Sequence, residues 1–239
     1  YPLLLLGVIS IYMLISYMAF SNARRSEQNK VWTGMARETA HQIGTPLSAL
    51  LGWIAYLKER YPAEIAFKEM ERDVDRLSSI TERFSKIGSR PELTDTDLSG
   101  TLQHTVDYLS TRMGKKVSFE QDISLGLLAK HNPQLLSWVI ENLVKNATDA
   151  VEGSGVIRLT ASPLEDSINI IVHDSGKGIP LKIQRNIFKP GFTTKNRGWG
   201  LGLSLARRII EEYHNGSIAL VESGSEKGTT FKIVLPAAL

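Results

Sequence analysis

The first part of the chain is an unbroken apolar run. Residues 2–20, PLLLLGVISIYMLISYMAF, contain no charged side chain and only two serines. At about 1.5 Å per residue, a helix of this length matches a bilayer core of about 30 Å. Positive charge follows the run instead of preceding it, unlike a cleavable signal peptide, and a core helix would normally have a more polar face. We therefore predict a transmembrane helix over residues 1–22, with residues 2–20 in contact with membrane lipid.

Basic residues come directly after this run. Arg24, Arg25 and Lys30 are the first positive charges of the chain. By the positive-inside rule, such residues lie on the cytoplasmic side of the membrane. We therefore expect everything from Ser21 onward to lie in the cytoplasm.

Two stretches with helical spacing follow. Apolar residues recur at steps of three or four over residues 32–57 and again over residues 67–87, on either side of Tyr61 and Pro62. Two antiparallel helices with one apolar stripe each do not enclose a core by themselves. We predict a helical hairpin over residues 23–90 that pairs with a second copy as a four-helix bundle in a homodimer. A monomer whose hairpin packs on its own C-terminal domain is the alternative.

A different pattern occupies residues 91–239. Short runs typical of strands alternate there with helical patterns expected near residues 98–112, 133–151 and 200–215. The strand-like runs are VSFEQDI, GVIRLT, INIIVHD and TTFKIVL. The fold class predicted for this second domain is α+β.

The amino-acid composition excludes several kinds of site and one class of partner. The 239 residues contain no cysteine, which excludes disulfides, zinc–thiolate sites, iron–sulfur clusters and cysteine nucleophiles. The 28 basic and 25 acidic residues leave a formal net charge of +3, an excess too small to indicate nucleic acid as a partner. The length allows one or two globular domains.

Polar residues gather in two motifs of the second domain. ENLVKNATDAV, over residues 141–151, places Asn142, Asn146 and Asp149 on one face of a helix. INIIVHDSGKGIP is a strand that ends in Asp174 and runs into a loop with two glycines. Such a loop sets a carboxylate beside backbone that can approach a flat ligand closely.

A third motif is rich in glycine. In GWGLGLSLARRII, Gly198, Gly200 and Gly202 precede an apolar helix. Backbone N–H groups at the start of such a helix are free to hold phosphate oxygens. The three motifs together indicate a nucleotide site more strongly than any one of them.

In this order, the motifs resemble the GHKL ATP-binding fold, and specifically the catalytic domain of sensor histidine kinases. ENLVKNATDAV is similar to the N box of that family, DSGKGIP to its G1 box, IFKPGFTTK to its F box and GWGLGL to its G2 box. The resemblance implies an α/β-sandwich for the second domain, with ATP and Mg²⁺ as ligands. Phe188 and Phe192 of the F box are expected to pack in the loop between the two glycine boxes.

The resemblance also implies individual roles. Asp174 would accept a hydrogen bond from the adenine amino group, and Asn146 would ligate Mg²⁺. Many kinases of the family have lysine where Asp149 stands, so Lys145 or Lys195 is expected to contact phosphate instead. The residues implied to bind the nucleotide are Asn142, Lys145, Asn146, Asp174, Gly176, Gly178, Thr193, Thr194, Lys195, Gly198, Gly200, Leu201 and Gly202.

One histidine lies in a motif of its own. ETAHQIGTPLSALLGW places Thr45 one helical turn after His41 and is similar to the H box of histidine kinases. The resemblance implies that His41 accepts the phosphoryl group and that Thr45 positions a water for dephosphorylation. Gln42 stands where most such kinases have an acid, so Glu38, one turn before His41, or water is expected to take the proton.

These features predict a membrane-anchored sensor histidine kinase of the bacterial cytoplasmic (inner) membrane, with its catalytic part in the cytoplasm. It would autophosphorylate His41 from Mg-ATP and pass the phosphoryl group to an aspartate in the receiver domain of a response regulator. One alternative is a nucleotide-binding dimeric scaffold without transferase activity. Another is a GHKL clamp ATPase, which the resemblance disfavours because Asn142 stands where those enzymes have a glutamate base.

Overall fold

The computed structural model describes residues 2–61, 91–113, 116–195 and 200–238, with scattered positions between 67 and 81. The chain divides into two compact units, Tyr1–Arg90 and Pro91–Leu239, each described here by itself. The boundary agrees with the change in sequence pattern near residue 91.

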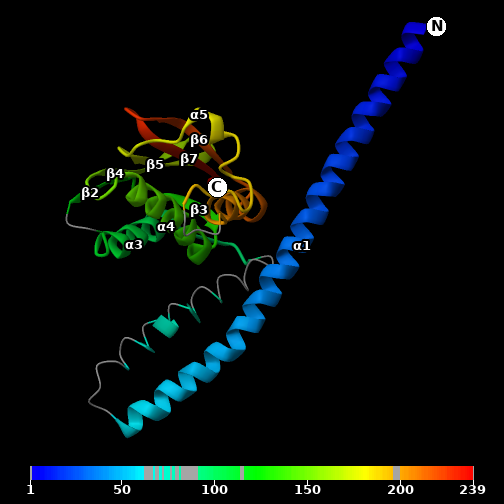
Figure 1. The fold of residues 1–239 in the computed structure, drawn as a ribbon. Helices are drawn as coiled ribbons and strands as arrows, with labels where there is room; N and C mark the ends of the chain where they lie inside the picture. Colours follow the sequence, from blue (N-terminus) through cyan, green and yellow to red (C-terminus); the bar gives the residue numbers. More distant parts are fainter. Residues whose placement is uncertain are drawn as a thin grey trace. The chain divides into compact units, whose positions relative to one another are not determined.

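The first unit is built on one long helix. Helix α1, Pro2–Arg60, has 59 residues and continues through Pro46 (Figure 1). The described positions between 67 and 81 are helical, and Val74 forms a small apolar cluster with Leu47 and Ile54 of α1. An ion pair of 2.7 Å joins Lys58 Nζ to Glu71 Oε1. These contacts are those of a second helical stretch packed on α1, as a hairpin requires.

The N-terminal end of α1 has an apolar surface. Large side chains of this segment are exposed, for example Leu3 at 85 % and Tyr12 at 72 %. Within the described part of the chain, a helix with the length and hydropathy of a membrane span is not found.

The second unit contains a five-stranded sheet of order β2-β4-β5-β7-β6. Strands β2 and β4 are parallel, and every other neighbouring pair is antiparallel. The strands are β2 (Val117–Ile123), β4 (Gly155–Leu164), β5 (Ser167–Asp174), β6 (Ser217–Gly224) and β7 (Gly228–Pro236). A separate two-stranded sheet pairs β1 (Thr94–Asp97) with β3 (Leu128–His131).

Helices form a second layer against this sheet (Figure 1). They are α3 (Leu98–Ser110), α4 (Pro133–Ala150) and α6 (Gly202–Arg208), which continues as the π-helical turn η1 (Ile209–Tyr213); α5 (Leu181–Gln184) is a single short turn. The α+β class and the α/β sandwich predicted for this unit are confirmed. The predicted helix over residues 200–215 is present as α6 and ends in the π-helical turn η1.

Local sequence explains the two elements that frame the site. Alternate residues of β5 are buried, and this period places Ile170, Val172 and finally Asp174 on the inner face. Helix α4 begins where the Asn132 side chain accepts a hydrogen bond from the Leu135 N–H, with Pro133 in the first turn. The core between the layers is made by Leu136, Val139, Ile140, Leu143, Ile157, Leu159, Ile170 and Ile233.

Candidate functional site

Asp174, the last residue of β5, is a buried carboxylate. Only 4 % of the residue is exposed, and its Oδ1 accepts a hydrogen bond of 2.9 Å from the Gly176 N–H. Burial raises the pKa of Asp174, while hydrogen bonds from Gly176 and Thr229 act in the opposite direction. A buried acceptor with a fixed position favours a ligand that donates a hydrogen bond to it.

The loop after Asp174 packs on the end of α4. A Cβ on Gly176 would lie 2.6 Å from the carbonyl carbon of Ala150, so only glycine allows this approach. The Lys177 N–H donates a 3.2 Å hydrogen bond to the Ala150 oxygen. Gly178 follows in the same loop with φ +71°. The predicted G1 loop is thereby held beside the helix that carries the predicted N box.

One turn of α4 faces the start of α6. Asn142 Oδ1 lies 3.4 Å from the position that a Cβ would take on Gly202, and Asn142 Nδ2 is buried without a hydrogen-bond partner among the described residues. A buried amide donor left without a partner costs about 1–3 kcal/mol. A ligand oxygen at this point would satisfy this donor, and Asn142 is among the residues that the family resemblance implies for nucleotide binding.

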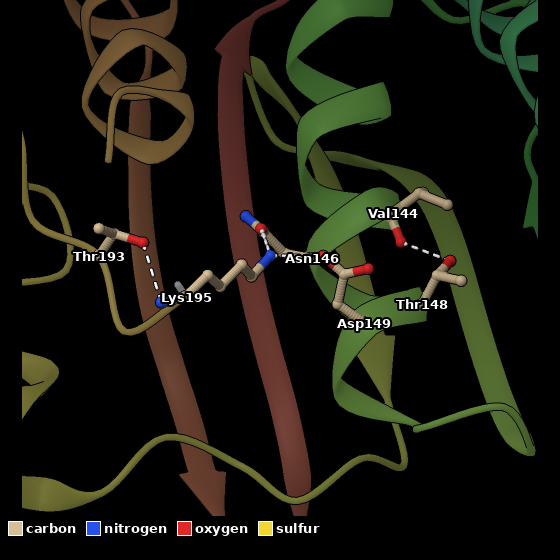
Figure 2. A network of polar contacts seen from close by, with 6 residues as sticks. All are labelled: Val144, Asn146, Thr148, Asp149, Thr193 and Lys195. Atoms are coloured by element: carbon tan, nitrogen blue, oxygen red, sulfur yellow. Dashed lines mark hydrogen bonds and ion pairs between the residues drawn. The ribbon is translucent and has the colours of Figure 1, made fainter. Parts of the chain in front are cut away.

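A lysine crosses from the loop after α5 to the same helix (Figure 2). Lys195 Nζ lies 2.9 Å from Asn146 Oδ1 and 2.5 Å from Asp149 Oδ2. The Thr193 hydroxyl accepts a hydrogen bond of 3.1 Å from the Lys195 backbone N–H. Lys195, predicted to contact phosphate, and Asn146, predicted to ligate Mg²⁺, therefore meet.

The start of α6 is held against the same loop. Gly200 has φ +65°, and its carbonyl accepts a hydrogen bond of 3.0 Å from the Gly191 N–H. Leu201 is the N-cap of α6, and Gly202 is its first residue. Gly198 lies outside the described residues.

Helix α4 is thus a common wall for the site. Its Asn142 faces the start of α6, its Asn146 and Asp149 hold Lys195, and its end supports the loop after Asp174. The structure gathers these residues from segments that are far apart in the sequence. Lys145 and Thr194 are exposed, and Lys145 points about 100° round the helix from Asn146.

Several known proteins are similar to this chain in sequence or fold. Residues 131–239 match the family model described as histidine kinase-, DNA gyrase B- and HSP90-like ATPase. The sensor histidine kinase ZraS of Escherichia coli (strain K12) is 33 % identical over 223 residues, covering 89 % of this chain and 47 % of ZraS. The catalytic domain of the histidine kinase ThkA is 30 % identical with a TM-score of 0.56, covering 61 % of this chain and 96 % of that domain. This chain belongs to the sensor histidine kinases.

The histidine kinase fold extends over most of the chain. The structure of ThkA in complex with the response regulator protein TrrA has a TM-score of 0.59 at 24 % identity and covers 93 % of this chain and 66 % of that one. At this identity the likeness concerns the fold alone. The chain spans about half the length of the ZraS relative.

The predicted H box of this histidine kinase lies in α1. His41, Glu38, Gln42 and Thr45 have helical backbone, but their side chains lie outside the described residues. The roles predicted for these four residues therefore stay predictions.

Three contacts complete the neighbourhood of the nucleotide motifs. Phe188 packs edge-on against Phe231, with ring centroids 6.1 Å apart, and the Arg207 guanidinium carbon lies 3.9 Å from the Phe188 ring centroid. Phe188 is therefore a packing residue, as predicted. Thr229 is a partner of Asp174 that sequence reasoning missed. In the sequence, only the TTF at the start of the last predicted strand pointed to it. In the structure, β5 pairs with β7, and this pairing sets Asp174 opposite Thr229.

Proposed function

We propose that this chain is the kinase portion of a membrane-anchored sensor histidine kinase that binds Mg-ATP in its second unit and phosphorylates His41. The observation that carries the proposal is the wall formed by α4. One helix brings together the buried Asp174 loop, the Lys195 segment and the start of α6, which are the three segments that the family resemblance assigns to base and phosphates. The H-box motif supplies the acceptor.

Each described residue has a task suited to its chemistry. Asp174 accepts a hydrogen bond from the adenine amino group, and Asn142 offers its unpartnered Nδ2 to a phosphate oxygen. Lys195 brings positive charge beside Asn146, where phosphate charge has to be balanced. Backbone N–H groups around Gly200 and Gly202 contribute further donors.

The residues present also suit Mg²⁺. Magnesium uses few protein oxygens and completes its shell with water and substrate phosphates. Asn146 Oδ1 is an oxygen of this type, and it already faces a cation, the Lys195 ammonium. When bound, Mg²⁺ would neutralise charge on the phosphates.

The transfer itself requires His41. A neutral imidazole nitrogen forms a bond to the γ-phosphorus of ATP while the bond to the oxygen of the ADP leaving group breaks. The proton displaced from the ring goes to Glu38 or to water, because the neighbouring Gln42 cannot accept it at neutral pH. Phosphohistidine then donates the phosphoryl group to an aspartate of a receiver domain.

The partner proposal has support of a different kind. The solved complex of ThkA with TrrA joins a histidine kinase of the same fold to a response regulator. We propose that a receiver domain likewise docks on this chain, and that Thr45 positions the water that dephosphorylates it.

Anchoring and dimerisation are further parts of the proposal. The uncharged run 2–20 and the exposure of its apolar side chains support attachment to lipid at the bacterial inner membrane, with the remaining chain in the cytoplasm. Exposed apolar residues of α1 such as Trp53, at 64 %, support pairing with a second copy.

Flotation with liposomes tests the attachment of residues 2–20 to lipid. The chain with these residues is compared with the chain without them, and recovery of both forms at the bottom of the gradient would contradict the attachment.

The decisive experiment measures phosphorylation. The full chain in detergent is incubated with Mg²⁺ and γ-labelled ATP, and the wild type is compared with His41→Gln and Asn146→Ala. We expect acid-labile, alkali-stable label on the wild type alone. ATP binding without label on the wild type would favour the scaffold over the kinase.

A further inference from the structure

Lys195 occupies a position between two oxygens of α4 (Figure 2). Asn146 and Asp149 are three residues apart, so their side chains lie on one face of the helix. Their oxygens, Asn146 Oδ1 and Asp149 Oδ2, lie 2.9 Å and 2.5 Å from the same ammonium nitrogen. Both side chains of the ion pair are about half exposed, so the pair is open to exchange with ions from solution.

This arrangement is that of a two-oxygen cation site. An amide oxygen and a carboxylate oxygen are ligands that suit Mg²⁺, which binds proteins through one or two such groups. The ammonium of Lys195 stands in for a cation there. Mg²⁺ and the Lys195 ammonium cannot both contact these two oxygens, because the two positive charges would then lie close together and repel each other strongly.

The position of Asp149 is otherwise unfavourable for a nucleotide kinase. A carboxylate beside a triphosphate is repelled unless a cation lies between them. A nucleotide bound beside Asp149 therefore needs a cation at this position. Lys195 supplies it in the structure.

We propose that Asp149 is a second protein ligand, with Asn146, of the Mg²⁺ that accompanies ATP, and that Lys195 is displaced from these oxygens when the metal binds. This inference rests on the proposed function, because it concerns the same nucleotide site. The displaced Lys195 then pairs with phosphate oxygens. Metal and lysine compete for the same two oxygens.

The test is the Mg²⁺ dependence of nucleotide binding, without any measurement of activity. Binding of a fluorescent ATP analogue to the full chain is titrated in EDTA and at increasing Mg²⁺, for the wild type, Asp149→Asn and Lys195→Met. The matched control is Glu120→Gln, because Glu120 is 45 % exposed and forms a 2.6 Å ion pair with Arg158 on the sheet. This variant removes one surface carboxylate whose exposure is similar to that of Asp149.

The two variants should act in opposite directions. Asp149→Asn should raise the half-saturating Mg²⁺ concentration at least about tenfold and tighten Mg-free binding, because the charged carboxylate ligand becomes a neutral amide and one charge that repels the phosphates is lost. Lys195→Met should lower the half-saturating Mg²⁺ concentration and weaken Mg-free binding. Glu120→Gln should behave as the wild type.

Other outcomes separate the inference from the proposed function. If both variants leave the half-saturating Mg²⁺ concentration unchanged and both weaken binding in EDTA, Asp149 only orients Lys195, and the inference is wrong while nucleotide binding stands. If the wild type binds no nucleotide at any Mg²⁺ concentration, the proposed function fails, and the inference fails with it.

Discussion

The Nε2 atom of His214 accepts a hydrogen bond of 3.0 Å from the backbone N–H of Asn132, the residue that caps α4. His214 is 2 % exposed, and its Nδ1 lies 2.8 Å from the Ile209 carbonyl oxygen. A carbonyl only accepts, so Nδ1 carries the proton and the ring is neutral. The first turn of the wall of the nucleotide site therefore depends on a neutral histidine.

The first prediction concerns acid stability. Burial lowers the pKa of His214 below its ordinary value of 6.5, and the neighbouring His131 acts in the same direction. The unfolded chain then binds more protons than the folded chain, so the free energy of unfolding decreases as the pH falls below about 6.5. Urea unfolding of the wild type between pH 8 and 5 measures the slope of the free energy of unfolding against pH. The slope should be smaller in His214→Gln and unchanged in His104→Gln, whose histidine is exposed.

A second prediction uses the close contact at Gly176. An added methyl would meet Ala150 at 2.6 Å, so Gly176→Ala should destabilise the second unit by about 1–3 kcal/mol and weaken nucleotide binding. Gly224→Ala is the matched control, since its added Cβ would meet nothing within 4 Å. Chemical unfolding and nucleotide titration measure the two effects. Equal stability of the two variants would show that the loop does not pack on α4.

The third prediction separates stability from binding at Asp174. Burial raises the pKa of this carboxyl, so the folded state loses stability as the pH rises through the raised pKa. Asp174→Asn removes this cost and should leave the melting temperature at pH 7 unchanged or higher. It should also weaken ATP binding by about ten- to a hundredfold, because the charged acceptor is lost. The test is the melting temperature with and without Mg-ATP, and an undiminished rise on adding ligand would contradict the role of Asp174.

A fourth prediction addresses the packing of Phe188. The ring lies between Phe231 and the Arg207 guanidinium. Phe188→Ala should cost about 2 kcal/mol, less than for a fully buried phenylalanine, because the residue is half-buried. Phe188→Leu keeps most of the apolar contact and should lose less stability. If both variants unfold at the wild-type urea concentration, the ring contributes no packing energy.

Sequence reasoning found the elements whose patterns are local and regular. Helix α4 was predicted within one residue of its end, because it combines an N-cap, a proline and a 3.6-residue period. Strand β6 was missed, since a register shift between Leu220 and Glu222 interrupts its alternation. Strands β1 and β3 were missed as well, being only four residues long.

By itself, the sequence determined the two elements that carry the site and the family to which the chain belongs. Helical period placed Asn142, Asn146 and Asp149 on one face, and strand period carried Asp174 to the buried end of β5, since both depend only on neighbouring residues. Only the tertiary structure decided that Lys195 holds Asn146 and Asp149 together, 46 or more residues away along the chain. This contact depends on the conformation of the loop after α5, which brings Lys195 next to α4. The pattern of neighbouring residues does not predict the conformation of such a loop.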